Sequence, residues 1–215
     1  RSAHRRGLAG LGIFRAAAER RGTPADLLVV GLGNPGLDYA RTRHNAGADC
    51  IAGLAAHHGS SLSLARKERA QVAELGVGGR RLVVATPTTY YNEAGAAVGA
   101  LVKRYGIDDP TKVVIVHDEL DLPVGKIKVK VGGGLAGNNG LKSIKGHLGT
   151  DAFVRVRIGV GKPPGTQQGR DHVLRRPGKR EREDLDVAIS EAAEAVERIL
   201  LDGVDAAMQH HNRRD

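Results

Sequence analysis

The sequence predicts an α/β fold in which helices pack on a mixed β-sheet. Short apolar runs rich in β-branched residues recur along the chain, and segments with helical spacing of apolar residues lie between them. Strands that alternate with helices favour a sandwich of helices around a sheet. The chain has 215 residues, the length of one domain, and neither an internal repeat nor a low-complexity linker divides it.

The first expected element is a strand at 27–32, an apolar run that ends in the turn GNPG at 33–36. A helix is predicted over 46–58, where apolar residues recur with helical spacing. The later apolar runs predict strands at 71–75, 81–85, 112–117, 126–131 and 153–160, and helices at 94–105 and 185–201.

Three loops follow directly on predicted strands, at 33–36, 87–92 and 117–123. In open α/β sheets, ligands bind beyond the carboxyl ends of the strands. We therefore expect residues from these three distant segments to meet at one site.

The charge of the chain indicates an anionic partner. The net charge is +9 and the sequence pI is near 10.0, which favours nucleic acid, although residues 1–26 contribute part of this charge through their arginines. Aromatic residues make up only 3% of the chain. If the protein binds RNA, contacts to phosphate and backbone should therefore dominate over stacking on bases.

Cys50 is the single cysteine of the sequence, which excludes an intramolecular disulfide and a zinc site built from several thiolates, and favours the cytoplasm. No apolar stretch approaches the roughly 20 residues that cross a bilayer. Residues 1–26 lack the apolar block of a secretory signal, so we interpret them as a flexible N-terminal extension. The domain is expected at 27–205, followed by a frayed C-terminal tail at 206–215.

A glycine pattern after the first strand offers an alternative function. Gly31, Gly33 and Gly36 match the GxGxxG turn of dinucleotide-binding proteins. However, Pro35 removes one of the backbone donors that such a turn presents to a pyrophosphate, and the acidic residue expected about 20 positions onward is missing. These features disfavour a nicotinamide-dependent oxidoreductase, and the glycines are better explained by a tight loop.

A histidine and an aspartate form the candidate catalytic pair. His44 precedes a predicted helix, and Asp118 follows the strand predicted at 112–117. A carboxylate that accepts the Nδ1 proton of a histidine sets its tautomer and stabilises the imidazolium that forms when the ring takes a proton. The alternatives are a surface histidine and a solvated acidic turn or weak divalent-cation site.

Three loop asparagines accompany this pair, namely Asn34, Asn92 and Asn139. Each is compatible with an ordinary turn asparagine. Neutral amides also donate to a developing oxyanion without competing for the proton, which suits hydrolysis of an acyl ester.

Four segments, in order, resemble the motifs of bacterial peptidyl-tRNA hydrolases: GLGNPGLDYARTRHNAG at 31–47, PTTYYNEAG at 87–95, HDELDLPVGKIKVKVGGG at 117–134 and NGLKSI at 139–144. The resemblance covers residues 27–205. It implies a single-domain α/β/α sandwich around a twisted mixed sheet, monomeric and free of metal and cofactor. The implied partner is peptidyl-tRNA, through its acceptor stem, 3′ end and 5′-phosphate, with no membrane and no obligate protein partner, in translation and ribosome rescue.

The resemblance also implies roles for residues. His44 corresponds to the catalytic histidine of the family and Asp118 to its partner. Asn92 corresponds to a residue at the reacting carbonyl or water, Asn34 to one at the peptide and terminal nucleotide, and Asn139 to one on the tRNA side of the cleft.

Further positions are implied by the same resemblance. Tyr39 falls near the scissile ester, and Tyr91 falls in the substrate site. Lys130 and Arg157 correspond to a basic pair that grips the 5′-phosphate of tRNA, on strands where basic residues alternate. The alternative is that this basic stripe is an ordinary solvated sheet face.

The implied mechanism is direct attack by water. His44 acts as general base, and the resulting imidazolium protonates the leaving ribose oxygen. A covalent serine route is less favourable because Ser60, Ser61 and Ser63 lie in a polar loop without a nucleophile-elbow sequence.

The sequence departs from the family pattern at four positions. Thr86 stands where a Lys is usual, Tyr91 where a Met is usual, Ala136 where a Gly is frequent, and Asn138 where a His is usual. The last two favour the main alternative within this resemblance, a non-catalytic RNA-binding relative that keeps the fold and the basic surface. Such a protein would bind tRNA and leave its ester intact.

Overall fold

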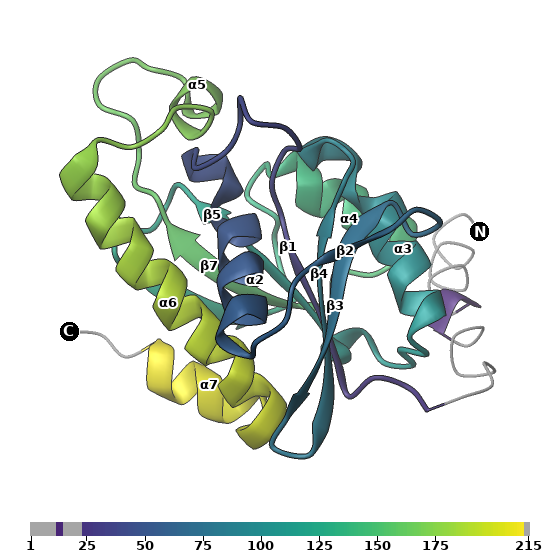
Figure 1. Cartoon of the computed structure of the whole chain (residues 1–215). Coiled ribbons are helices and arrows are strands. Elements are labelled where there is room, and N and C mark those ends of the chain that lie inside the picture. Colours follow the sequence, from purple (N-terminus) through teal and green to yellow (C-terminus); the bar gives the residue numbers. More distant parts are fainter. Residues whose placement is uncertain (1–11, 15–22, 213–215) are drawn as a thin grey trace.

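The computed structural model describes residues 12–14 and 23–212, and its centre is a seven-stranded mixed sheet in the order β2-β3-β4-β1-β5-β7-β6 (Figure 1). The predicted α/β class is confirmed. The strands are β1 (Leu27–Gly31), β2 (Ser63–Ala65), β3 (Ala70–Val77), β4 (Arg80–Pro87), β5 (Val113–Glu119), β6 (Ile127–Val131) and β7 (Val154–Gly159).

Parallel pairing in the middle of the sheet sets where the loops lie. β1 pairs in parallel with β4 and with β5, and β5 pairs in parallel with β7. The antiparallel pairs β2·β3, β3·β4 and β6·β7 extend the sheet on either side. The loops after β1, β4 and β5 therefore leave the same edge of the sheet, as expected.

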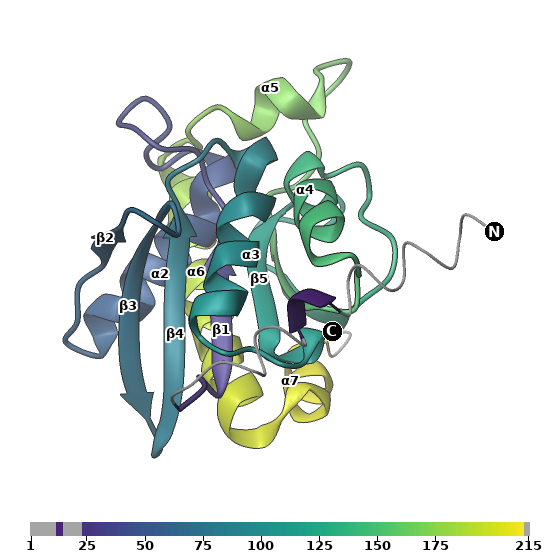
Figure 2. The same cartoon turned by 90° about the vertical axis from the view of Figure 1, so that its right-hand side faces the viewer.

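Helices cover both faces of the sheet. In Figure 2, α3 and α4 lie in front of the sheet, while α2 and α6 lie behind it. The helices are α2 (Ala46–His57), α3 (Ala94–Arg104), α4 (Asn139–Leu148), α5 (Gly169–Val173), α6 (Lys179–Asp202) and α7 (Val204–His211), with short 3-10 turns η1 (Arg43–Asn45), η2 (Tyr91–Glu93) and η3 (Pro110–Lys112).

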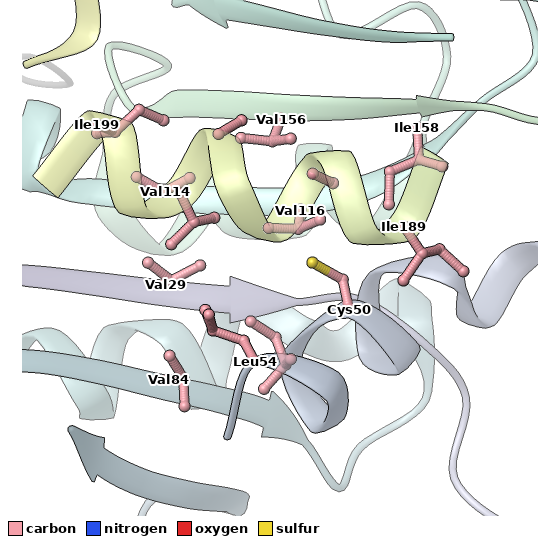
Figure 3. Close-up of a cluster of buried hydrophobic side chains, with 14 of the residues drawn as sticks. Val29, Cys50, Leu54, Val84, Val114, Val116, Val156, Ile158, Ile189 and Ile199 are labelled. Atoms are coloured by element: carbon pink, nitrogen blue, oxygen red, sulfur yellow. The ribbon is translucent and has the colours of Figure 1, made fainter. Parts of the chain in front are cut away.

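Alternation along the central strands produces two hydrophobic cores. Val29 and Val116 point to the core that contains α2 and α6, which Figure 3 shows together with Cys50 and Ile189. Val30, the next residue of β1, points to the opposite core beneath α3 and α4. All five residues of β1 are buried. A strand that is buried on both faces carries a continuous apolar sequence, which is the pattern from which β1 was predicted.

Gly31 of the GxGxxG pattern and Gly47 of α2 allow close packing of α2 on the sheet. A Cβ on Gly31 would lie 2.1 Å from the carbonyl oxygen of Gly47, and a Cβ on Gly47 would lie 2.2 Å from that of Val116. The N-terminal turn of α2 thus touches the ends of β1 and β5. This contact brings the residues just before α2 next to the end of β5.

Gly47→Ala is expected to destabilise the fold by about 3 kcal/mol, because the added methyl group meets backbone atoms that cannot rotate away. Gly53→Ala is the matched control on the same helix, since a Cβ there meets nothing within 4 Å. It should stabilise by about 0.5–1 kcal/mol through helix propensity. Urea unfolding of both variants checks this prediction, and equal stabilities would contradict it.

Both ends of the chain differ from the expected domain limits. Residues 206–211, expected in a frayed tail, belong to α7, whose Ala207 is fully buried in the core that contains α6. Apolar burial holds this segment against the sheet. Within the extension expected at residues 1–26, Phe14 is buried in the core beneath α3 and α4. Residues 1–11 and 15–22 lie outside the described part of the chain.

Candidate active site

A cleft of about 780 Å³ lies at the sheet edge where β1, β4 and β5 end. The predicted residues from all three loops line it, together with Asn139 at the start of α4. Of the predicted site residues, only Lys130 and Arg157 do not line this cleft. The expectation that the three loops meet at one site is therefore confirmed.

His44 and Asp118 form the centre of the cleft. His44 lies in η1, and Asp118 is the second-to-last residue of strand β5 instead of following the strand. The Nδ1 atom of His44 is 3.0 Å from each carboxylate oxygen of Asp118. The side chain of His44 is 17% exposed and that of Asp118 is 4% exposed. With Nδ1–H donated to the carboxylate, the neutral imidazole keeps its lone pair on Nε2.

Asp118 is held in its ionised form. Burial acts to raise the pKa of Asp118, but the adjacent His44, their hydrogen bond and the nearby His117 and Tyr91 outweigh it, so the pKa lies below its usual value. The carboxylate is therefore an acceptor throughout the neutral range. An ionised, buried acceptor of this kind suits stabilisation of a protonated imidazole.

Tyr91 packs against the pair and is almost fully buried, although it also lines the cleft. Its ring stacks on His44 with centroids 3.6 Å apart and an interplanar angle of 10°, and its hydroxyl donates to Asp118 Oδ1 over 2.9 Å. Only 3% of Tyr91 is exposed. The side chain of Tyr91 is thus buried in contact with both His44 and Asp118.

The asparagines divide into a structural and an exposed group. The Oδ1 atom of Asn34 accepts the N–H of Tyr91 over 2.8 Å, which ties the GNPG turn to η2. Asn45 exchanges two further hydrogen bonds with the backbone of Asn34. Asn92 and Asn139 are exposed and line the cleft.

The basic stripe lies on the face of β6 and β7 opposite to the core side chains Val129 and Val156. Lys128 pairs in register with Arg157, and Lys130 pairs with Arg155. Arg155 is buried and donates to the carbonyl of Gly132, and the Nε atom of Arg157 is 3.0 Å from a carboxylate oxygen of Glu119. Lys128 and Lys130 are exposed. The exposed positive charge of this stripe therefore belongs to its lysines.

Arg43 was not predicted as a site residue. Its guanidinium makes a bidentate ion pair with Glu181 of α6, at 2.6 and 2.8 Å, and donates to the carbonyls of His172 and Arg175. These contacts hold η1, and with it His44, against α5 and α6. The only signal in the sequence was the position of Arg43 next to His44.

The segment between β7 and α6 was also missed. Lys162, Gln167 and Arg170 line the cleft from a loop and from the short helix α5. This segment holds few apolar residues, so hydrophobic periodicity gave no signal for it.

Comparison with known proteins identifies the family. The family model described as peptidyl-tRNA hydrolase matches residues 28–215. The chain belongs to the peptidyl-tRNA hydrolase family. A peptidyl-tRNA hydrolase of Pseudarthrobacter chlorophenolicus is 48% identical over 184 residues, which covers 85% of this chain and 93% of the relative. One of Arthrobacter sp. FB24 is 46% identical over 187 residues, covering 86% and 95%.

Solved structures agree with this assignment to the peptidyl-tRNA hydrolases. A crystal structure of peptidyl-tRNA hydrolase from Acinetobacter baumannii superimposes with a TM-score of 0.82 at 36% identity, covering 90% of this chain and 98% of that one. The resemblance drawn from the four motifs is thereby confirmed. The glycine pattern after β1 needs no dinucleotide, because close packing of α2 accounts for Gly31.

The helices in the described part of this peptidyl-tRNA hydrolase include none that is both long and apolar enough to cross a membrane.

Proposed function

We propose that this chain hydrolyses the ester bond of peptidyl-tRNA with His44 as the general base and Asp118 as its partner. One observation carries the proposal: the His44–Asp118 pair, with Nδ1 3.0 Å from both carboxylate oxygens, lies in the cleft formed by the predicted loops. Membership of the peptidyl-tRNA hydrolase family supports the substrate class.

The reaction begins with proton transfer from water. Nε2 of His44 takes a proton as the water oxygen attacks the ester carbonyl, and Asp118 stabilises the imidazolium that forms. The attack produces a tetrahedral oxyanion, to which the exposed amide of Asn92 donates a hydrogen bond. The imidazolium then returns its proton to the ribose oxygen as the carbon–oxygen bond breaks. Free tRNA and a peptide with a carboxylate leave the cleft.

Other residues bind the substrate in this proposal. Asn34 uses its Oδ1 atom for the N–H of Tyr91, so its amide hydrogens are what it offers to the peptide and the terminal nucleotide. Tyr39 lies beside the ester, with its ring edge-on to Tyr90 at 6.4 Å between centroids. Asn139, exposed at the first turn of α4, contacts the tRNA side.

The 5′-phosphate of tRNA is bound by Lys130 together with Arg157. Lys130 is exposed, while Arg157 is partly buried and paired with Glu119. In this arrangement the flexible Lys130 side chain carries an exposed charge, whereas the guanidinium of Arg157 is held in place by its ion pair. The acceptor stem would lie along the sheet edge at β6, next to the glycine-rich loop.

Lys130→Ala is expected to raise KM for peptidyl-tRNA several-fold and to leave kcat nearly unchanged, because the lost contact is remote from the ester. The slope of log KM against log salt should fall by about 1. Lys112→Ala is the control, since Lys112 is bound to Asp108 at the opposite end of β5. Steady-state kinetics across a salt series measure both effects, and an unchanged slope would rule out the phosphate contact.

The remaining features of the proposal concern the state of the enzyme. We expect a monomer acting in the cytoplasm, with no cofactor, metal or obligate protein partner. Size-exclusion chromatography with light scattering tests the monomer, and turnover after treatment with chelator tests the independence from metal.

The deciding experiment uses N-acetyl-aminoacyl-tRNA beside the unblocked aminoacyl-tRNA. Release of the blocked amino acid with the unblocked ester spared would establish the activity. Binding of tRNA without turnover would instead identify a non-catalytic RNA-binding relative. Asn138 was a reason to consider that alternative, but its Oδ1 atom accepts the N–H of Leu141 over 3.0 Å and caps α4, so the loop at this departure is well formed.

Ala136 is the second departure in this loop. Its φ of +48° lies in the left-handed region, where a residue with a Cβ costs about 1 kcal/mol more than glycine. The loop therefore keeps the conformation that a glycine would adopt, at a small energetic cost, and this supports an active enzyme.

A further inference from the structure

Tyr91 and Asn138 form a chain of hydrogen bonds that ends on the His44–Asp118 pair. The Nδ2 atom of Asn138 donates to the Tyr91 hydroxyl over 3.1 Å, and the hydroxyl donates to Asp118 Oδ1 over 2.9 Å. Asp118 in turn accepts from Nδ1 of His44. Tyr91 and Asn138, which lie far apart in the sequence, thus meet beside this pair.

The direction of each hydrogen in this chain follows from the cap of α4. Asn138 accepts the N–H of Leu141 through Oδ1, so its Nδ2 hydrogens must face Tyr91. Because the Tyr91 oxygen accepts one of these hydrogens, its own hydrogen is directed to Asp118. Asp118 is thus held between two donors, Tyr91 and His44, and its rotation is restricted.

The ring of Tyr91 acts on His44 directly. The two rings lie nearly parallel, at 10° with 3.6 Å between centroids, which sets the plane of the imidazole and therefore the direction of Nε2. The face of an aromatic ring also attracts a cation, so the stack favours the imidazolium formed during the reaction. Burial, with Asp118 nearby, raises the pKa of Tyr91 well above its usual value, which keeps its hydroxyl a donor.

We propose that Tyr91 is a positioning residue for the general base, and that Asn138 acts on His44 only through the Tyr91 hydroxyl. This inference rests on the proposed function, because it gives Tyr91 a task only if His44 is the base. It replaces the substrate-binding role that the sequence suggested for Tyr91. It also gives Asn138 a role in the reaction besides capping α4.

Tyr91→Phe is the first test, because it removes the hydroxyl and keeps the stacked ring. We expect kcat to fall about 10-fold, the scale of one hydrogen bond to a charged group, with KM unchanged. The acid limb of the kcat profile should move to higher pH, because a carboxylate with one donor fewer holds the imidazolium proton more strongly. A purely structural role of Tyr91 would not move this limb.

Asn138→Ser is the second test. Serine keeps an oxygen that can cap α4 but is too short to donate to Tyr91. We expect a loss of about 3-fold in kcat, and the double variant Tyr91→Phe/Asn138→Ser should lose no more than Tyr91→Phe alone. Tyr105→Phe is the matched control for the loss of a buried tyrosine hydroxyl, since Tyr105 lies in the core at the end of α3.

Two results would overturn the inference: wild-type kcat and pH profile in Tyr91→Phe, or losses that multiply in the double variant. His44→Ala in the same assay separates the positioning role of Tyr91 from the proposed function. An active His44→Ala variant refutes the proposed function. An inactive His44→Ala variant beside a normal Tyr91→Phe variant refutes only the positioning role. Should Tyr91→Phe melt below the assay temperature, the pH profile of Asn138→Ser carries the same test.

Discussion

His44→Ala is expected to lower kcat by about 10²- to 10⁴-fold, the largest effect of any single substitution in this chain. The loss follows because, in the proposed mechanism, the imidazole is both the base that activates water and the acid that protonates the leaving ribose oxygen. No other side chain lies 3.0 Å from both oxygens of Asp118 in the described residues. The measurement is single-turnover release of N-acetyl-amino acid from tRNA.

The controls for His44→Ala separate chemistry from folding and binding. His57→Ala changes an exposed histidine at the far end of α2 and should leave kcat at the parent value. Binding of deacylated tRNA should be nearly unchanged in His44→Ala, because the proposed phosphate contacts at Lys130 and Arg157 do not involve His44. If His44→Ala kept a tenth or more of the parent kcat, another group would have to be the base.

Asp118→Asn is expected to lower kcat by about 100-fold or more without changing the shape of the site. The amide cannot stabilise an imidazolium, and its NH₂ group would favour the wrong tautomer of His44. KM should stay close to the parent value, because Asp118 is 4% exposed and lies beneath His44. The same single-turnover assay measures this, with Asp108→Asn, an exposed partner of Lys112, as control. A drop in affinity for tRNA instead of kcat would refute the assigned role.

Asp118→Asn also has an expected signature in stability against pH. The pKa of Asp118 is lowered in the folded protein, although burial alone would raise it. A lowered carboxyl pKa contributes stability above the unfolded-state value of about 4, and this contribution is lost as the pH falls through the folded-state pKa. The melting temperature of the variant should therefore fall less than that of the parent between about pH 5 and about pH 2.

Much of the fold was predictable from local sequence. Strands such as β1 and β5 are apolar and β-branched because both faces are buried, and α2 and α6 carry helical spacing. The helix α4 was missed, although Leu141, Ile144 and Leu148 have helical spacing, because two glycines lower its helix propensity and a glycine-rich loop precedes it. α7 was missed because its burial depends on packing against α6.

The location of the candidate site was also predictable from the sequence. Loops that follow the strands of an open α/β sheet gather at one edge, so the sequence alone predicted that His44, Asp118 and Asn92 would come together. Three features required the tertiary structure, because each depends on contacts between distant segments: the anchoring of η1 by Arg43 and Glu181, the pairing of Arg157 with Glu119, and the position of Tyr91.

Tyr91 illustrates the difference most directly. The sequence determined that a tyrosine follows β4 next to Asn92, and its type suggested a substrate contact. Only the packing of α4 against η2, and of η1 against β5, decided that its ring stacks on His44 and that its hydroxyl lies between Asn138 and Asp118. The physical reason is that strand patterning specifies which edge a residue reaches, whereas the partners of a buried polar group are specified by the neighbours that fold around it.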